Sequence, residues 1–256
     1  MEIENIKEFL DIKYDQYNRT EFIESDPICI PRSFNAPNDI EIAGFFAAII
    51  SWGKRSTIIK NGFELIRLMD NQPFDFIINS NVSELKYFRN FKHRTFNYID
   101  AVYFIKSLKN IYNNHGSIGA VFENNYEETG SLKNAIINFR NIFFELPYPD
   151  RTLKHISDIS KGAAAKRINM FLRWMIRKDK RGVDFGIWHK IPASALYIPL
   201  DVHTGNISRK LGLLKRKQND WKAVEELTDI LRKFDSNDPV KYDFALFGLG
   251  VRDTIF

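Results

Sequence analysis

Residues 39–51, Asp-Ile-Glu-Ile-Ala-Gly-Phe-Phe-Ala-Ala-Ile-Ile-Ser, are apolar on nearly every side of a helix. The large apolar side chains are Ile42, Phe45, Phe46, Ile49 and Ile50. Their spacing of three and four residues predicts an α-helix. A helix without a polar face is normally the buried centre of a larger bundle. We therefore expect other helices to pack around this one.

The same spacing predicts helices along most of the chain. We expect them at residues 2–17, 55–69, 74–78, 97–114, 131–145, 163–178, 203–213, 220–233 and 239–249. Three prolines in residues 18–37 favour an extended loop there. Asp220 and Asn237 stand where N-cap residues are preferred. Together these patterns predict an all-α fold.

Positive charge is concentrated in one part of the chain. The whole sequence holds 37 Lys and Arg against 32 Asp and Glu, whereas residues 151–217 hold 16 against 4. Clustered cations act as one patch and favour an anionic partner such as a nucleic acid.

Composition excludes several classes of site. Cys29 is the only cysteine, so an internal disulfide and a cysteine-ligated zinc or iron–sulfur site are excluded. No run of about 18 apolar residues is present, so we expect no membrane partner. The acidic first residues, which lack an apolar signal core, and the single thiol favour a cytoplasmic location.

A lysine stands in the first turn of the predicted helix at residues 163–178. The sequence around it is Ser160-Lys161-Gly162-Ala163-Ala164-Ala165-Lys166-Arg167. The positive end of the helix dipole disfavours the charged form of an amine at Lys166, and a neutral amine is a nucleophile. Gly162 and its small neighbours allow the backbone to approach a phosphate closely.

This predicted helix is amphipathic. Its apolar stripe is Ala164, Ile168, Phe171, Leu172 and Met175, and the opposite face holds Lys166, Met170, Arg173 and Arg177. We expect the second face to present cations to a partner. A solvated surface without a function is the alternative.

An aspartate precedes the predicted helix at residues 203–213, in the sequence Pro199-Leu200-Asp201-Val202-His203-Thr204-Gly205. Asp201 is a natural N-cap, which is a structural role. A capping carboxylate is also fixed in orientation and ionised, so it suits a group that stabilises a developing cation or orients a water. A phosphate contact is one role for His203 and one for Gly205. The alternatives are a structural role for the histidine and close helix packing at the glycine.

These residues resemble the helix-hairpin-helix (HhH-GPD) DNA glycosylase superfamily. In that family a hairpin with a glycine four residues before a lysine binds the DNA backbone, and an aspartate begins a later helix. Gly162 and Lys166 match the first pattern, although Ala164 replaces the usual second glycine; Leu200-Asp201-Val202-His203 matches the second. The spacing from Lys166 to Asp201 is similar to that of the archaeal 8-oxoguanine glycosylases, and the nearest likeness is to an uncharacterised bacterial branch close to them.

The resemblance implies a two-lobed helical fold over about residues 40–250. One lobe would combine residues 1–38 with about 200–256. The other would hold about 39–199, with the hairpin near 150–167.

The resemblance also implies roles for single residues. Lys166 would be the nucleophile and Asp201 its carboxylate. The flipped base would be bound by Trp52, Met170, Asp243 and Phe247, and the DNA backbone by Lys161, Gly162, Arg167, Arg173, His203 and Gly205. Core packing is the alternative for the apolar members, whereas Asp243, in an otherwise apolar helix, needs a partner if it is buried.

The implied activity is excision of a damaged base from DNA, in this branch an oxidised guanine, without a metal or other cofactor. The nucleotide would be flipped into a pocket between the lobes, and a Schiff base on Lys166 would permit strand cleavage. Three alternatives stay open. They are a glycosylase without lyase activity that uses Asp201 to activate water, a catalytically inactive DNA- or RNA-binding protein, and a helical domain that binds an acidic protein.

Overall fold

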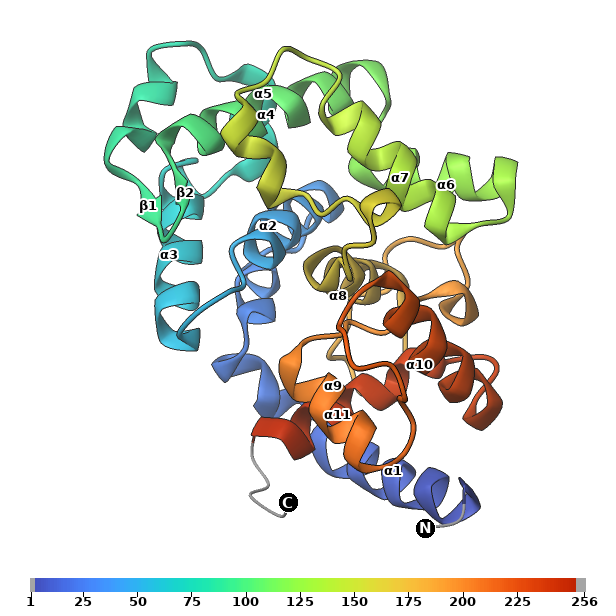
Figure 1. Cartoon of the computed structure of the whole chain (residues 1–256). Coiled ribbons are helices and arrows are strands. Elements are labelled where there is room, and N and C mark those ends of the chain that lie inside the picture. Colours follow the sequence, from blue (N-terminus) through green and yellow to red (C-terminus); the bar gives the residue numbers. More distant parts are fainter. Residues whose placement is uncertain (1–2, 252–256) are drawn as a thin grey trace. The chain divides into compact units, whose positions relative to one another are not determined.

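Helices make up most of residues 3–251, which are the residues that this computed structural model describes (Figure 1). The α-helices are α1 (Ile3–Tyr17), α2 (Pro37–Ile49), α3 (Arg55–Arg67), α4 (Pro73–Asn79), α5 (Tyr98–Asn114), α6 (Ile118–Thr129), α7 (Leu132–Phe143), α8 (Lys166–Ile176), α9 (Val202–Lys210), α10 (Trp221–Phe234) and α11 (Tyr242–Val251). Strands β1 (Lys92–His93) and β2 (Phe96–Asn97) form one antiparallel hairpin. The all-α class is confirmed. Within the described range, no helix is both long enough and apolar enough to cross a membrane.

Every predicted helix is present, with its ends within three residues of the predicted ones. Helix α6 was not predicted. Ser117 caps its first turn by accepting the Ala120 N–H, and Gly130 ends it with a φ of +66°. Its buried residues all lie between Ile118 and Phe122, so the apolar spacing is not repeated over the polar second half.

One predicted N-cap was wrong. Asn237 is followed by Asp238, which takes the position before the 3-10 turn Pro239–Lys241. The side chain of Asp235 accepts the N–H groups of Asn237 and Asp238, both at 3.0 Å. Asp235 therefore organises this turn, and α11 begins after it.

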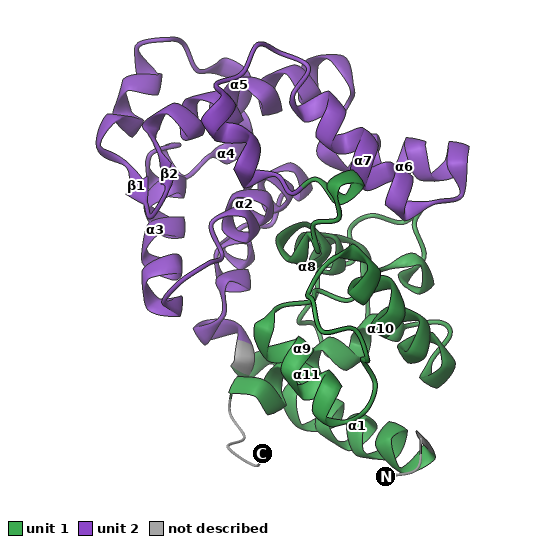
Figure 2. Cartoon of the chain, in the orientation of Figure 1, with its two compact units in different colours: residues 1–22, 158–256 green, residues 23–157 purple. Residues whose placement is uncertain are grey.

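The described chain divides into two compact units (Figure 2). Unit 1 comprises Met1–Phe22 and Asp158–Phe256, and unit 2 comprises Ile23–Ser157. The two ends of the chain thus share a unit, in which α1 packs along α11 (Figure 1). These boundaries differ from the expected ones, because residues 23–38 belong to the central unit and residues 158–199 belong to the unit of the chain ends.

Side-chain contacts explain both differences. Ile30 packs so tightly on α3 that a Cβ at Gly62 would lie 2.2 Å from its Cδ1, which holds the segment before α2 in unit 2. In unit 1, Arg173 of α8 forms an ion pair with Asp243 of α11. The segment that leads into α8 therefore belongs with the C-terminal helices.

The helix predicted to be the buried centre is α2, and that prediction is confirmed for unit 2. All residues from Ile40 to Ile49 are buried. The ring of Phe45 contacts the rings of Phe104, Phe139 and Phe143, with centroids 5.6 to 5.9 Å apart. Helices α2, α5 and α7 therefore share one aromatic core.

A carboxylate lies inside this apolar helix. Glu41 is buried and accepts the N–H groups of Ile118 (2.9 Å) and Gly119 (2.8 Å), together with the hydroxyl of Tyr112 (2.5 Å). The first N–H groups of a helix have no partner within it and carry the positive end of its dipole. Glu41 therefore supplies the acceptor that fixes the start of α6 against α2.

Replacing Glu41 by Gln should lower the free energy of unfolding by about 2 to 4 kcal/mol, because the neutral amide loses the charge-assisted bonds to α6. Urea denaturation measures the change. Glu64→Gln, which removes an exposed ion pair with Arg67, is the control and should remain close to wild type. A Glu41 variant as stable as this control would show that the buried carboxylate does not hold α6.

Candidate active site

A short hairpin at residues 158–165 precedes α8. Gly162 has a φ of +86°, and no atom would lie within 4 Å of a Cβ placed there. The backbone conformation, rather than close packing, therefore requires this glycine. Ala165, directly before α8, also has a positive φ of 49° and provides no side-chain cap. The first N–H groups of α8 thus receive no acceptor from their N-cap residue.

Lys166 is the first residue of α8. Its side chain is half-buried, and its Nζ lies 3.4 Å from the Sδ of Met170, one turn along the helix. A thioether is a weak acceptor. Within residues 3–251, no carboxylate oxygen lies within the 4.0 Å of an ion pair with this amine. The amine therefore stands at the positive end of a helix dipole without an anionic partner bonded to it.

Asp201 is the N-cap of α9, which confirms the predicted structural role. Its Oδ1 accepts the Thr204 N–H at 2.9 Å. The residue is half-buried. The capping bond fixes the orientation of the carboxylate, because rotation would leave the Thr204 N–H without its acceptor.

Three consecutive residues join the hairpin to the aspartate turn. The Trp221 N–H donates to the carbonyl oxygen of Gly162 (2.9 Å). Asp220 forms an isolated antiparallel bridge with Ala163 of the hairpin. The Nδ2 of Asn219 donates to the carbonyl oxygen of Asp201 (3.0 Å). Both predicted motifs are thus fastened to one short segment within unit 1.

The sequence analysis did not identify Asn219. Its Oδ1 accepts from the guanidinium of Arg209 at 2.6 Å, so the amide is held at both ends. An asparagine beside the N-cap of α10 has the pattern of an ordinary turn. Nothing in the local sequence indicates its partner, which lies 18 residues earlier in the chain.

Asp243, in the first turn of α11, is a third charged group in this region. Its side chain is buried and forms an ion pair with Arg173. Burial raises the pKa of Asp243 to about 6; Arg173 and Lys166 act to lower it, and Asp201 acts to raise it further. The charges of Lys166 and Asp201 therefore both reach this carboxylate.

Arg173 and Arg177 do not lie on a solvated cationic face, so that prediction was wrong. Both residues are buried, and both pair with Asp184, at 3.2 Å and 3.0 Å. Arg177 also pairs with Asp179 and Asp238, at 2.8 Å and 2.9 Å. A helical wheel shows which residues share a face, but not that acidic partners from elsewhere in the chain cover it. Arg173 is accordingly engaged inside the protein rather than offered to a DNA phosphate.

Besides Asp243, two predicted base-binding residues lie on the same unit as Lys166, and they differ in exposure. Met170 is 8% exposed and touches the amine. Phe247 is half-buried and lies one turn after Asp243 on α11. Met170 is therefore directly at the predicted nucleophile, and Phe247 shares a helix with the third charged group.

Trp52 lies in unit 2, after the end of α2, and is half-buried. Its ring stacks on His155, with centroids 5.9 Å apart, and meets the ring of His93 edge-on at 5.0 Å. The Nε2 of His93 also lies 3.1 Å from the carbonyl oxygen of Trp52. Two histidines therefore fix both the ring and the backbone of this residue.

The remaining predicted phosphate-binding residues have different environments. The side chain of Lys161 is 83% exposed, and His203 is also exposed. Arg167 is half-buried, and burial lowers its pKa to about 10, so it stays charged at neutral pH. Gly205 is buried, and a Cβ there would lie 2.7 Å from the Oδ1 of Asn219. Close packing of Asn219 therefore accounts for Gly205.

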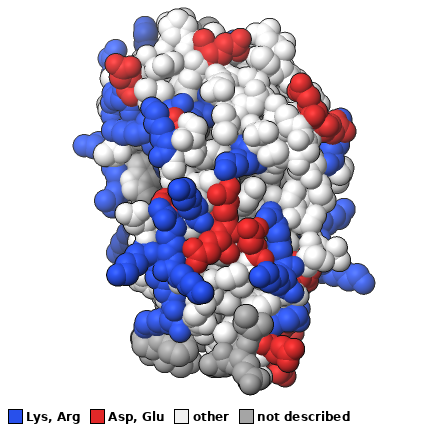
Figure 3. Space-filling model, turned by 45° about the vertical axis from the view of Figure 1, so that its right-hand side comes forward, with Lys and Arg blue, Asp and Glu red and all other residues white. Residues whose placement is uncertain are grey.

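Positive charge on the surface is interrupted by acidic groups. On the face shown in Figure 3, Lys and Arg side chains gather in the lower part around a group of Asp and Glu side chains. A uniform basic surface is therefore not present on that face, and any phosphate contact must use cations that no neighbouring carboxylate already neutralises.

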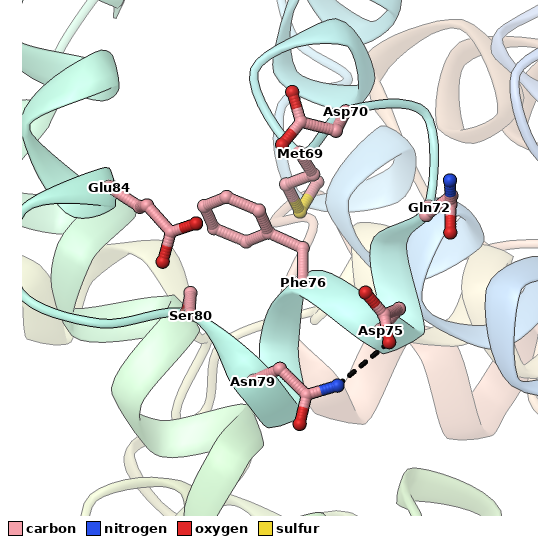
Figure 4. A pocket seen from close by; sticks show the side chains of 8 residues that line it. All are labelled: Met69, Asp70, Gln72, Asp75, Phe76, Asn79, Ser80 and Glu84. Carbon is pink, nitrogen blue, oxygen red and sulfur yellow. Dashed lines mark hydrogen bonds between the residues drawn. The ribbon is translucent and has the colours of Figure 1, made fainter.

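A pocket on unit 2 is lined by none of the predicted site residues (Figure 4). Its walls are Met69, Asp70, Gln72, Asp75, Phe76, Asn79, Ser80 and Glu84. Three carboxylates give it the wrong charge for a phosphate. Within the described residues, no group of His, Cys, Asp and Glu is suited to holding a metal ion.

The chain belongs to the family described as protein of unknown function (DUF2400), whose model matches residues 26–252. The matched region includes most of both units, although not α1, and every predicted site residue from Trp52 to Phe247. No curated protein and no solved structure matches the chain.

The buried carboxylate gives a pH-dependent prediction. The pKa of Asp243 is higher in the folded protein than in the unfolded chain, so its contribution to stability is full below about pH 4 and is lost as the pH rises through about 6. Asparagine imitates the protonated form. Between about pH 4 and pH 7.5, the stability of Asp243→Asn relative to wild type should therefore rise by up to about 3 kcal/mol.

Urea denaturation at the two pH values measures this difference. Asp229→Asn removes an exposed carboxylate that pairs with Arg232, and it should show little change between them. A stability of Asp243→Asn relative to wild type that stays constant, or that falls as the pH rises, would contradict the burial cost assigned to Asp243.

Proposed function

We propose that this protein is a DNA glycosylase with AP-lyase activity, built on the HhH-GPD fold, that excises a damaged base such as oxidised guanine. The observation that carries the proposal is the attachment of the lysine hairpin and the aspartate turn to residues 219–221. Residues that lie 35 positions apart in the sequence are thereby held in one region of unit 1.

In the proposed reaction, the neutral Nζ of Lys166 attacks C1′ of the deoxyribose. The glycosidic C1′–N bond breaks, and the base leaves with its electron pair and takes up the proton that the Nζ loses when the new bond forms. The ionised carboxylate of Asp201 stabilises the positive charge that develops on the sugar. Opening of the sugar ring converts the amine adduct into a Schiff base, from which β-elimination cleaves the strand.

The surroundings of Lys166 support a nucleophilic role. The amine stands in the first turn of α8, and the thioether of Met170 gives an ammonium group there only a weak acceptor. A carboxylate bonded directly to the amine would favour the protonated, unreactive form instead. Placing the carboxylate on a separate helix keeps it near the sugar without neutralising the nucleophile.

The surroundings of Asp201 and Asp243 support the remaining roles. The Oδ1 of Asp201 is engaged in capping, and Oδ2 is left to face a substrate. Arg173 holds the Oδ2 of Asp243, so Oδ1 is the atom that would accept a hydrogen bond from an N–H of the flipped base. Two carboxylates thus have one fixed and one accepting oxygen each.

Borohydride reduction of a mixture with abasic-site DNA should trap a covalent protein–DNA adduct. Lys166→Gln should reduce the trapped fraction to less than about 1% of wild type, because the amide is not nucleophilic. Lys180→Gln is the control, since it removes an exposed lysine of unit 1 that has no predicted site role, and its adduct should persist. Gel electrophoresis measures the trapped fraction. An adduct that survives Lys166→Gln would remove Lys166 from the role.

Asp201→Ser separates the capping role from the chemical one. Serine caps a helix about as well as aspartate, so the melting temperature should stay close to that of wild type. The rate of base release should nevertheless fall by about 100-fold or more, because the carboxylate is lost. Single-turnover assays on DNA that contains 8-oxoguanine measure the rate. A stable variant with an unchanged rate would confine Asp201 to capping.

A protein that binds DNA without chemistry is the second candidate. It is favoured by Ala164, which stands where the glycosylase hairpin usually has its second glycine. That function predicts salt-dependent DNA binding and no trapped adduct. Release of base without an adduct would instead indicate a glycosylase that uses Asp201 to activate water.

A further inference from the structure

The loop between α9 and α10 contains the basic run Lys215-Arg216-Lys217. Its arginine is engaged within the protein. The Nε of Arg216 donates to Asp220 at 2.6 Å, and its carbonyl oxygen accepts from the Nε of Arg209 at 2.8 Å. The two lysines that flank Arg216 are both exposed. The run therefore turns its middle residue inward and its outer residues toward solvent.

The backbone of this loop is anchored before and after the lysines. Leu213 and Leu214 are buried, and their N–H groups both donate to the carbonyl oxygen of Ser208. The Lys215 N–H donates to the Oε1 of Glu226 at 2.6 Å. Because these bonds fix the backbone of the loop in the free protein, little backbone entropy is lost when its exposed side chains bind a partner.

The loop also lies against the lysine hairpin. Its last residue, Asp220, forms the antiparallel bridge with Ala163, and the next residue donates to the carbonyl oxygen of Gly162. The hairpin carries the exposed Lys161, whose Nζ lies 3.9 Å from the Oδ2 of Asp158 at the edge of ion-pair distance. Exposed lysines from two separate segments therefore flank one backbone junction, beside the predicted nucleophile.

We propose that Lys215 and Lys217 bind phosphates of the DNA backbone next to the hairpin. The substrate class rests on the proposed function, but the contact does not depend on any covalent step. A lysine is a flexible point charge that suits phosphate contacts without base specificity. Arg173 and Arg216 are paired within the protein, whereas Lys215 and Lys217 are exposed cations beside the hairpin. The lysine-lined loop thus extends the DNA footprint beyond the hairpin.

The expected effect is a change in salt dependence. Each phosphate contact contributes about 0.9 to the slope of log affinity against log salt concentration on duplex DNA. Lys215→Gln/Lys217→Gln should therefore reduce the slope by about 1 to 2 and weaken binding about tenfold near 0.1 M salt. Affinity should fall by a similar factor for any DNA sequence.

Fluorescence anisotropy with an undamaged, labelled duplex of about 20 base pairs, titrated at several salt concentrations, measures the slope. Lys180→Gln/Lys233→Gln is the matched control, because it removes two exposed lysines from elsewhere on unit 1 and should leave the slope unchanged. Equal melting temperatures would show that all variants are folded. An unchanged slope in the loop variant, or an equal loss in the control, would overturn the proposal.

The same samples separate this inference from the proposed chemistry. Wild-type DNA binding that weakens in the loop variant, together with no borohydride adduct, would retain the loop contact and reject the glycosylase. If the wild type forms a borohydride adduct but the loop variant shows the same salt slope as the wild type, the glycosylase would be retained and the loop contact rejected. No DNA binding by the wild type would reject both.

Discussion

The buried ion pair between Arg173 and Asp243 joins the helix that begins with Lys166 to the last described helix of the chain. Removing two charges from water costs several kcal/mol for each, and only close, hydrogen-bonded partners recover that cost. Arg173 and Arg177 therefore constrain α8, because moving this helix would leave buried guanidinium groups without their carboxylates. Since α11 in turn packs on α1 and α9, the same constraint assembles unit 1 from the two ends of the sequence.

The charged groups of unit 1 differ in whether another protein group pairs with them. Arg173 is neutralised internally, and half of the Asp243 carboxylate is used to do so. Lys166 and Asp201 are each fixed by a helix terminus but are not bonded to one another. This division suits a reaction that needs a neutral amine and an ionised acid at the same time, since a direct ion pair between them would suppress the nucleophile.

Local sequence determined much of this arrangement. The positions of most helices and the capping role of Asp201 follow from residues within a few positions of one another, where periodicity and i, i+3 bonds operate. Long-range partners could not be predicted in the same way. The helical wheel placed Arg173 on the surface because it describes one helix alone. The partners Asp184 and Asp243 lie outside that helix. Gly205 is required because the side chain of Asn219, which is distant in the sequence, packs against it. Unit boundaries were also missed, because they depend on contacts such as that between Ile30 and Gly62.

The central claim is that the amine of Lys166, the first residue of α8, forms the bond to the sugar. Tandem mass spectrometry of the proteolysed, borohydride-reduced wild-type adduct identifies that amine directly. The account predicts a reduced sugar remnant on Lys166. A remnant on another lysine, with Lys166 unmodified, would contradict it.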